Sequence, residues 1–165
     1  MIVVSDTSPL NYLILIGYAH LLEALYGQVI IPRAVWDELR QPGAPDPVRE
    51  WVDDLPAWVE VREAFVPDTT LTLDLGEQEA ITVALELKAD LVLLDERRGR
   101  REAVGRGLAV TGTLGVLEAA ARRGLVELPE AITRLKQTSF RAPPRLLEEM
   151  LERVQEPAGE GSDPD

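Results

Sequence analysis

Leu-Val-Leu-Leu-Asp, at residues 91–95, predicts a β-strand that is apolar at four successive positions and ends on an acid. An uninterrupted apolar run is typical of a parallel strand that is covered on both faces. Ile-Val-Val-Ser at residues 2–5 predicts a second short strand, and Asp6 follows it. The carboxyl ends of parallel strands meet at one edge of a sheet, where ligands bind. Asp6 and Asp95 are therefore predicted at that edge.

Strand and helix patterns alternate along the rest of the chain. Further strands are predicted at residues 28–31, 58–61 and 108–110, and the alternation in 58–61 is typical of a strand at a sheet edge. The predicted helices cover residues 10–16, 19–25, 32–40, 46–54, 76–88, 96–106, 113–123, 129–136 and 143–154. This order predicts an α/β fold, a three-layer α/β/α sandwich with a central, mostly parallel sheet.

The length of 165 residues is suited to a single domain, which we predict over residues 1–155. Residues 156–165 are acidic, rich in Gly and Pro and without large apolar side chains, so they are predicted to be a disordered tail. The sequence has no uncharged apolar run of membrane-spanning length and no basic segment ahead of its first strand. We therefore expect a cytoplasmic protein with no membrane partner.

Residue composition limits the chemistry. The chain has no cysteine and one histidine, which excludes thiol nucleophiles, disulfides and structural zinc, and His20 has no pattern of a catalytic triad around it. Any catalysis must use carboxylates, hydroxyls or arginine. A net charge of −12, from 17 basic and 29 acidic residues, disfavours binding of nucleic acid by phosphate neutralisation alone. A divalent metal would change that balance locally.

Four acids are the candidates for a site. Asp6 and Asp95 end strands, while Glu38 and Glu77 lie on the predicted helices between them. Clustered carboxylates are typical ligands of Mg²⁺ or Mn²⁺, which lower the pKa of a coordinated water and neutralise charge on a phosphodiester. This pattern predicts a metal-dependent nucleophile without histidine or cysteine, and it leaves the number of metal ions open.

Two other uses of a strand-end acid fit the sequence less well. A haloacid-dehalogenase-type phosphotransferase needs a second Asp two positions after its nucleophile, where this chain has Ser8. A receiver domain needs a lysine after its last strand, but the only lysines, Lys88 and Lys136, lie on predicted helices elsewhere. No glycine-rich phosphate-binding loop is present.

Five short motifs, in order, give the chain a recognisable pattern between about residues 2 and 150. They are Val-Ser-Asp-Thr-Ser-Pro-Leu at 4–10, Ile-Pro at 31–32 with Val-Trp-Asp-Glu-Leu at 35–39, Leu-Gly-Glu-Gln-Glu-Ala-Ile at 75–81, Leu-Asp-Glu-Arg-Arg-Gly-Arg at 94–100 and Val-Thr-Gly-Thr-Leu-Gly-Val-Leu at 110–117. The set resembles the motifs of PIN-domain proteins and, more narrowly, those of the DUF3368 branch, close to VapC-type toxins.

The resemblance implies an α/β/α nuclease fold that uses Mg²⁺ or Mn²⁺ to hydrolyse RNA phosphodiester bonds. It also implies a homodimer and an antitoxin protein as partner. Asp6 matches the first family acid, Glu38 the second and Asp95 the last. Glu77 stands where the family typically has Asp, and its extra methylene moves the carboxylate outward by about one bond. Glu79 is rotated by about 200° from Glu77 on a helix, so we choose Glu77 for the site.

Several residues near these acids have two interpretations each. Thr7, Ser8 and Thr113 are suited either to capping helices or to donating hydrogen bonds to a carboxylate or phosphate. The arginines that follow Asp95 are suited either to a solvated helix face or to guiding RNA phosphates. The three of these that we assign to substrate binding are Arg97, Arg98 and Arg101.

Three function hypotheses remain. The first is a metal-dependent endoribonuclease, the toxin of a toxin–antitoxin pair, with Asp6, Glu38, Glu77 and Asp95 as catalytic residues and metal ligands. The second is a catalytically weak or inactive PIN-like module that binds RNA or protein. The third is a deoxyribonuclease or flap-type nuclease that uses the same acids.

Overall fold

The fold is described by a computed structural model that covers residues 1–65 and 73–155. The chain divides into two compact units, Met1–Val116 and Leu117–Asp165. The prediction of one domain over residues 1–155 stays a prediction, and the predicted tail at 156–165 lies outside the described residues. No helix in the described part of the chain combines the length and the apolar composition needed to cross a bilayer.

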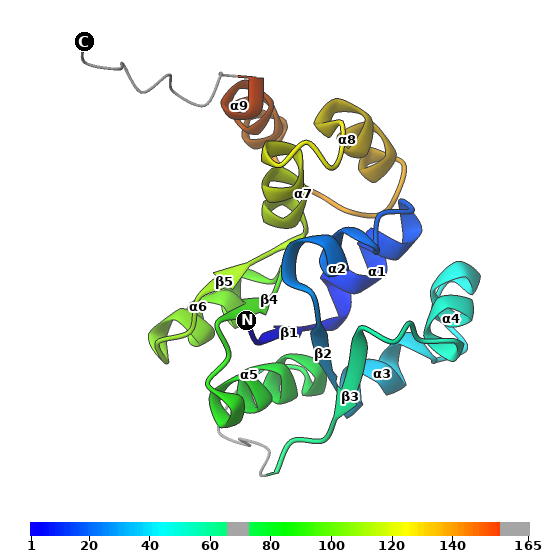
Figure 1. The fold of residues 1–165 in the computed structure, drawn as a ribbon, viewed down its shortest axis with the longest axis vertical. Helices are drawn as coiled ribbons and strands as arrows, with labels where there is room; N and C mark the ends of the chain where they lie inside the picture. The colour runs from blue at the N-terminus through cyan, green and yellow to red at the C-terminus, as the bar shows by residue number, and fades with distance from the viewer. Residues whose placement is uncertain (66–72, 156–165) are drawn as a thin grey trace. The chain divides into compact units, whose positions relative to one another are not determined.

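A five-stranded sheet forms the centre of the first unit (Figure 1). Its strands are β1 (Val3–Ser5), β2 (Val29–Pro32), β3 (Val59–Arg62), β4 (Leu91–Leu93) and β5 (Val110–Thr111). Every pairing is parallel, and the order across the sheet is β3-β2-β1-β4-β5. The predicted parallel sheet is confirmed, with β3 at an edge as its alternating sequence indicates.

Helices occupy the predicted positions between and after the strands. They are α1 (Thr7–Leu15), α2 (Leu21–Tyr26), α3 (Arg33–Leu39), α4 (Asp46–Asp53), α5 (Leu75–Leu87), α6 (Arg97–Gly105), α7 (Thr113–Arg122), α8 (Leu128–Lys136) and α9 (Pro144–Gln155). Helix α5 packs on β1, β2 and β4 and also contacts α3 (Figure 1).

The sheet is buried on both faces because its strands are apolar at consecutive positions. Val4 and Val92 point toward a core that includes Ile81 and Ala84 of α5. The neighbouring positions point to the opposite face, and Val3 of β1 is equally buried there. A sheet flanked by helices is the predicted α/β architecture.

Most predicted boundaries differ from the structure by one to three residues, and two of the differences have a local cause. Helix α1 begins at Thr7 rather than residue 10, because Pro9 falls in the first turn, where a missing N–H leaves no intrahelical bond unmade. The last strand is Val110–Thr111 rather than residues 108–110. The reason is that residues 107 and 108 close α6: the N–H of Leu108 donates to the carbonyl of Ala103.

The second unit contains α8, α9 and the end of α7. Glu118 of α7 accepts hydrogen bonds from Arg153 of α9 at 3.0 Å and from Arg122 at 3.2 Å. These guanidinium groups hold the pKa of Glu118 below its usual range, with the Arg153 bond as the main cause. The pair ties α9 to α7 within this unit.

Candidate active site

Three of the predicted acids line one cavity at the carboxyl edge of the sheet. Asp6 directly follows β1, Glu38 lies in the last turn of α3, and Glu77 lies in the first turn of α5. The cavity has a volume of about 230 Å³. Its other lining residues in the described part of the chain are Thr7, Ser8, Leu73, Asp74, Glu96 and Arg98. Five carboxylates therefore face one guanidinium in this acidic cavity.

Gly76 leaves the space in which two of these carboxylates approach each other. A Cβ atom at this position would lie 3.0 Å from Glu38 Oε2, 3.2 Å from Asp6 Oδ1 and 3.4 Å from Thr7 Oγ1. The absence of a side chain at the start of α5 thus lets the helix come close to the end of β1. Both carboxylate oxygens border the same small volume.

Asp6 is the most deeply buried acid of the cavity. It is 4% exposed, and its Oδ1 atom has no hydrogen-bond partner. Burial raises the pKa of Asp6 well above its usual range; the nearby backbone N–H of Thr7 opposes the shift, while the negative charges of Asp74, Glu77 and Glu38 add to it. A charged carboxylate in this position is unfavourable without a cation or a donor.

Glu77 has one oxygen in a structural role and one without a partner. Asp74 accepts a hydrogen bond from the N–H of Glu77 at 2.8 Å, and Glu77 Oε2 accepts from the N–H of Asp74 at 3.3 Å, which makes a reciprocal capping box at the start of α5. The other oxygen, Oε1, is buried and unpaired. Burial raises the pKa of Glu77, followed by the negative charge of Asp74, with smaller contributions from Glu96 and Glu38.

The capping box also explains a residue that the sequence reasoning missed. Asp74 and Glu77 have the spacing of an N-cap acid and its partner at the third helical position, which is a recognisable helix-start signal. That signal indicates Asp74 as the residue before the helix, and the structure places it in the lining of the acidic cavity with Glu77. Glu96, which precedes α6, also lines the cavity, and its only sequence signal was its position after Asp95.

Thr7 holds Glu38 in place. Its hydroxyl donates to Glu38 Oε2 at 2.6 Å, so it links the first turn of α1 to the last turn of α3. The residue that caps α1 is Asp6, and its side chain makes no capping hydrogen bond. Of the two interpretations of Thr7, the structure therefore has the donor to a carboxylate. Ser8 lines the cavity next to it.

Asp95 follows β4 but is not among the described residues that line the cavity. Its Oδ1 accepts from the N–H of Thr113 and its Oδ2 accepts from the Thr113 hydroxyl, each at 2.7 Å. Burial raises the pKa of Asp95, and the two Thr113 bonds and the nearby Arg100 oppose that shift. A Cβ atom at Gly112 would lie 2.5 Å from Asp95 Oδ1, so the carboxylate is closely enclosed.

The arginines of α6 are not all near the acids. Arg98 lines the acidic cavity, whereas Arg97 and Arg101 are exposed and do not belong to its described lining. Arg100, which was not chosen as a site residue, is the arginine that influences Asp95. The predicted substrate-binding role of Arg97 and Arg101 stays a prediction.

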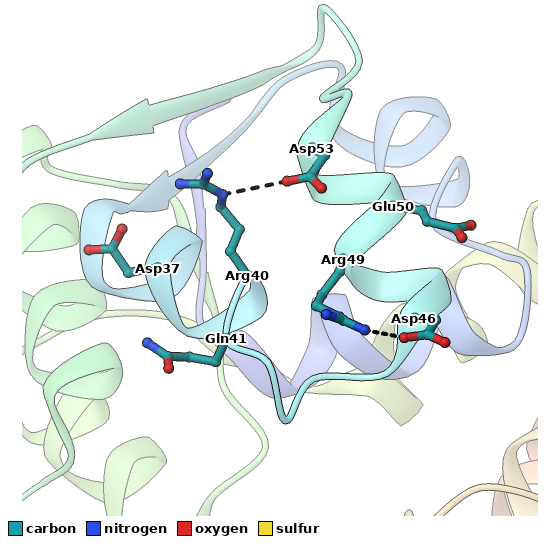
Figure 2. Close-up of a pocket in the computed structure, with 7 residues that line it drawn as sticks. All are labelled: Asp37, Arg40, Gln41, Asp46, Arg49, Glu50 and Asp53. Carbon is teal, nitrogen blue, oxygen red and sulfur yellow. Dashed lines mark hydrogen bonds and ion pairs between the residues drawn. The ribbon is translucent and has the colours of Figure 1, made fainter.

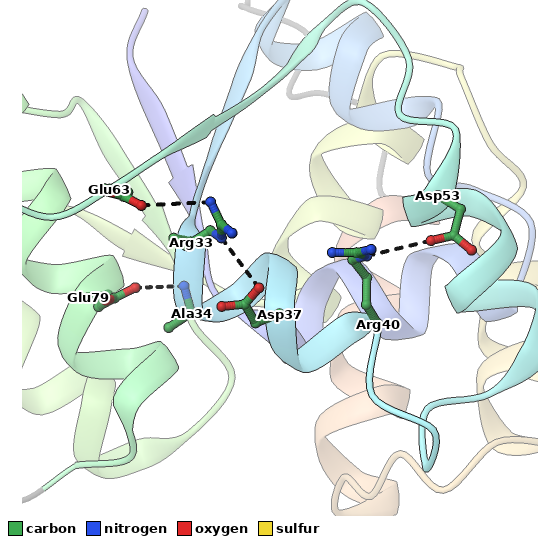
Figure 3. Close-up of polar contacts among 7 residues, drawn as sticks. All are labelled: Arg33, Ala34, Asp37, Arg40, Asp53, Glu63 and Glu79. Carbon is green, nitrogen blue, oxygen red and sulfur yellow. Dashed lines mark hydrogen bonds and ion pairs between the residues drawn. The ribbon is translucent and has the colours of Figure 1, made fainter.

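Glu79 lies outside the acidic cavity. Its carboxylate accepts a hydrogen bond from the N–H of Ala34 at 2.7 Å (Figure 3). This bond attaches the start of α3 to α5, the helices that position Glu38 and Glu77 respectively. Glu77 and Glu79 are two residues apart on α5 and therefore point to different sides of the helix. Glu77 lines the acidic cavity, and Glu79 binds the start of α3.

A larger cavity, of about 710 Å³, lies between α3 and α4 (Figure 2). Its charges are mostly paired: Arg40 contacts Asp53 at 3.5 Å, and Arg49 contacts Asp46. The Arg40 guanidinium also stacks on the Trp36 ring, 3.9 Å from its centroid. The charges of this larger cavity therefore largely satisfy one another.

The donor set of the acidic cavity fits a hard divalent cation. Its side chains offer carboxylate oxygens, and two buried ones, Asp6 Oδ1 and Glu77 Oε1, have no partner. Within residues 1–65 and 73–155, however, no three acidic or histidine side chains are placed so that they could together hold a metal ion. The chemistry of the donors fits a cation, and the present side-chain positions do not gather three of them.

Comparisons with known proteins agree with this architecture. Residues 2–156 match the family model described as PIN domain, DUF3368. The fold is similar to that of a PilT N-terminus domain protein from the hyperthermophilic archaeon Sulfolobus solfataricus P2, with a TM-score of 0.54 and 21% sequence identity over 73% of this chain and 93% of that one. A comparison with curated proteins gave no match.

Proposed function

We propose that this chain, which belongs to the PIN-domain family, is a metal-dependent endoribonuclease that hydrolyses RNA phosphodiester bonds. Members of the family are typically nucleases. One observation supports the proposal most strongly: Asp6 and Glu77 come from different elements, and each has a buried carboxylate oxygen without a partner in the same cavity. A charged carboxylate with such an oxygen is costly in the folded protein unless a cation or a hydrogen-bond donor meets it.

Asp6, Glu38 and Glu77 are the residues that would hold Mg²⁺ or Mn²⁺ in this cavity. When bound, such a cation lowers the pKa of water and neutralises charge on the phosphodiester. Of the two Glu77 oxygens, the unpaired Oε1 would face the cation, since Oε2 accepts the capping-box hydrogen bond from Asp74. Arg98, the one guanidinium among the described lining residues, would bind a phosphate oxygen.

Asp95 is proposed as a further metal ligand that Thr113 orients. Its position after β4, next to β1, brings it to the same sheet edge as Asp6. Release of one Thr113 bond would free a carboxylate oxygen for the cation. Thr113 is thus a positioning residue in the proposed site.

The toxin role, the homodimer, the antitoxin partner and the cytoplasmic location rest on the family resemblance and on composition. Size-exclusion chromatography with light scattering tests the homodimer. Growth arrest on expression, relieved by the product of an adjacent reading frame, tests the toxin role. Expression without arrest would leave a nuclease outside a toxin–antitoxin pair.

RNA cleavage is the direct test of the proposed activity. Wild type and Asp6→Asn are incubated with structured RNA, single-stranded RNA and single-stranded DNA in EDTA, Mg²⁺ or Mn²⁺. We expect cleavage of RNA that needs metal and is lost in Asp6→Asn. Glu50→Gln removes an exposed acid outside the acidic cavity and serves as the matched control. Full activity of Asp6→Asn would refute the proposal, and cleavage of DNA alone would favour a deoxyribonuclease.

One observation favours binding without cleavage as a second function. Both carboxylate oxygens of Asp95 are engaged by Thr113, and no three acids of the described residues are gathered around one point. A binding module would retain RNA affinity in EDTA and show no rise in thermal stability with Mn²⁺. A nuclease would show that rise.

A further inference from the structure

A second cavity adjoins the acidic cavity and differs from it in charge. It has a volume of about 370 Å³, within the range of pockets that hold small organic groups. Thr7, Ser8 and Glu38 line both cavities, so the two share this wall. Glu38, on the shared wall, is the only charged side chain among the described residues that line the second one. We call it the neutral cavity.

Two segments of the first unit build the neutral cavity. Ser8, Asn11 and Tyr12 share one face of α1, since they are three and four residues apart. Gln41 follows the end of α3 and also lines the cavity. The N–H of Gln41 donates to the carbonyl of Glu38 at 3.2 Å, and the carbonyl of Gln41 accepts from the N–H of Ala44 at 2.9 Å. These backbone bonds fix the turn that presents Gln41.

The chemistry of the lining selects a neutral, planar and polar group. Asn11 and Gln41 each have an amide donor and an amide acceptor, while Tyr12 offers an aromatic ring. Leu39, Ala44 and Pro45 add apolar surface. A phosphate would find no cationic side chain here, and a metal ion would find one carboxylate. A nucleobase matches the lining, because its edge needs both donors and acceptors and its face stacks on aromatic or apolar groups.

We propose that the neutral cavity binds one nucleobase of the RNA strand, with Asn11 and Gln41 reading the base edge and Tyr12 packing against the base. This inference rests on the proposed nuclease function, because the phosphodiester in the acidic cavity is what brings the adjacent base to the neutral cavity. The shared wall of Thr7, Ser8 and Glu38 then lies beside the sugar. Asn11 and Gln41 are therefore specificity-determining residues for the position next to the cleaved bond.

Base preference in binding is the first measurement. Anisotropy titrations use fluorescent hexanucleotides of A, C, G or U and the Asp6→Asn variant, which blocks cleavage. We expect one base to be favoured by about 5- to 100-fold, the range expected for a pair of amide contacts. Adding Asn11→Ala or Gln41→Ala should reduce this preference to less than about 2-fold. Gln28→Ala removes an exposed amide outside the cavity and is the matched control.

The cleavage map of the active protein is the second measurement, and it separates this inference from the nuclease proposal. If wild type cuts RNA and the cut positions follow one base, Asn11→Ala and Gln41→Ala should spread the cuts over other bases. If wild type cuts RNA but both variants keep its map and its binding preference, the base-binding inference is overturned and the nuclease stands. If nothing is cut but the preference is present and lost in the variants, the nuclease proposal fails and base binding stands.

Loss of folding is kept apart from loss of recognition by a conservative variant. Gln41→Glu keeps the shape of the side chain but replaces the amide donor with an acceptor. We expect it to fold as wild type does, by thermal melting and circular dichroism, and to lose the preferred base. An unchanged preference in a folded Gln41→Glu protein would remove Gln41 from the base edge.

Discussion

Replacing Gly76 with alanine separates the stability of α5 from the function of the acidic cavity. The new methyl group would lie 3.0 Å from Glu38 Oε2 and 3.2 Å from Asp6 Oδ1, closer than nearly all ordinary Cβ contacts. The carboxylates would have to move by a few tenths of an ångström. Glu38 is exposed and can move, but Asp6 is enclosed. The methyl group would therefore push apart the two acids that border this volume.

The opposing contributions to stability nearly cancel. Alanine in place of glycine stabilises a helix interior by about 0.5–1 kcal/mol, which is an upper limit here because Gly76 lies in the first turn of α5. Displacement of the carboxylates costs a comparable amount, on the order of 1 kcal/mol for a mild steric conflict in a packed region. We therefore expect the free energy of unfolding without metal to stay within about 1 kcal/mol of wild type. Catalysis responds more strongly, because misplacement of reacting groups by about 1 Å costs up to 100-fold in rate.

The assay combines RNA cleavage in Mg²⁺ with thermal melting in EDTA and in Mn²⁺. Because the carboxylates move by a few tenths of an ångström rather than about 1 Å, we expect Gly76→Ala to cleave about 3- to 10-fold more slowly and to lose part of the stabilisation by Mn²⁺. Gly105→Ala is the matched control, since Gly105 also lies in a helix and a Cβ there would meet nothing within 4 Å. Wild-type cleavage and full Mn²⁺ stabilisation in Gly76→Ala would refute the placement of the site between these acids.

Three further outcomes follow from the same geometry. Asp6→Asn should raise the free energy of unfolding at neutral pH in EDTA by about 1–2 kcal/mol, because it removes a buried charge; a melting temperature below that of wild type would contradict this. Folding raises the pKa values of Asp6, Glu77 and Asp95. At a pH between their unfolded-state and folded-state pKa values, the folded protein therefore binds more protons than the unfolded one. Denaturant titrations of wild type in EDTA should therefore show stability that rises as the pH falls through the raised pKa values, and that rise should be smaller in Asp6→Asn. Thr113→Val should lower stability by about 1–2 kcal/mol and slow cleavage, because Asp95 Oδ2 loses its donor, whereas Thr113→Ser should retain both properties.

The negative charge of the whole chain gives a cation in the acidic cavity a second effect, on the approach of RNA. At a net charge of −12, RNA is repelled at long range, and Arg98 is the one guanidinium in the cavity lining described. The divalent cation thus has two effects in the proposed site, on the reacting phosphodiester and on RNA approach. It is this dependence that the EDTA arms of the cleavage and binding experiments measure.

Local patterns were sufficient to predict the elements and their order. The apolar runs at β1 and β4 predict buried parallel strands, and helical spacing between them predicts the crossovers. The sequence also identified Asp6 and Asp95 as candidate site residues, because an acid at the end of a buried strand lies at the ligand-binding edge of the sheet. Its lack of cysteine and its single histidine left carboxylates as the chemistry.

Side-chain partners could not be read from the sequence, since they depend on contacts between residues far apart in the chain. The Thr7–Glu38 bond joins residues 31 apart, and Asp95 is held by Thr113 across 18 residues. Only the packed structure shows that Glu38 shares a cavity with Asp6, whereas Asp95 is not among the described residues that line it. The sequence by itself determined which residue types end the strands and begin the helices. The tertiary structure decided which carboxylates are paired, because hydrogen bonds and burial arise only when the elements pack together.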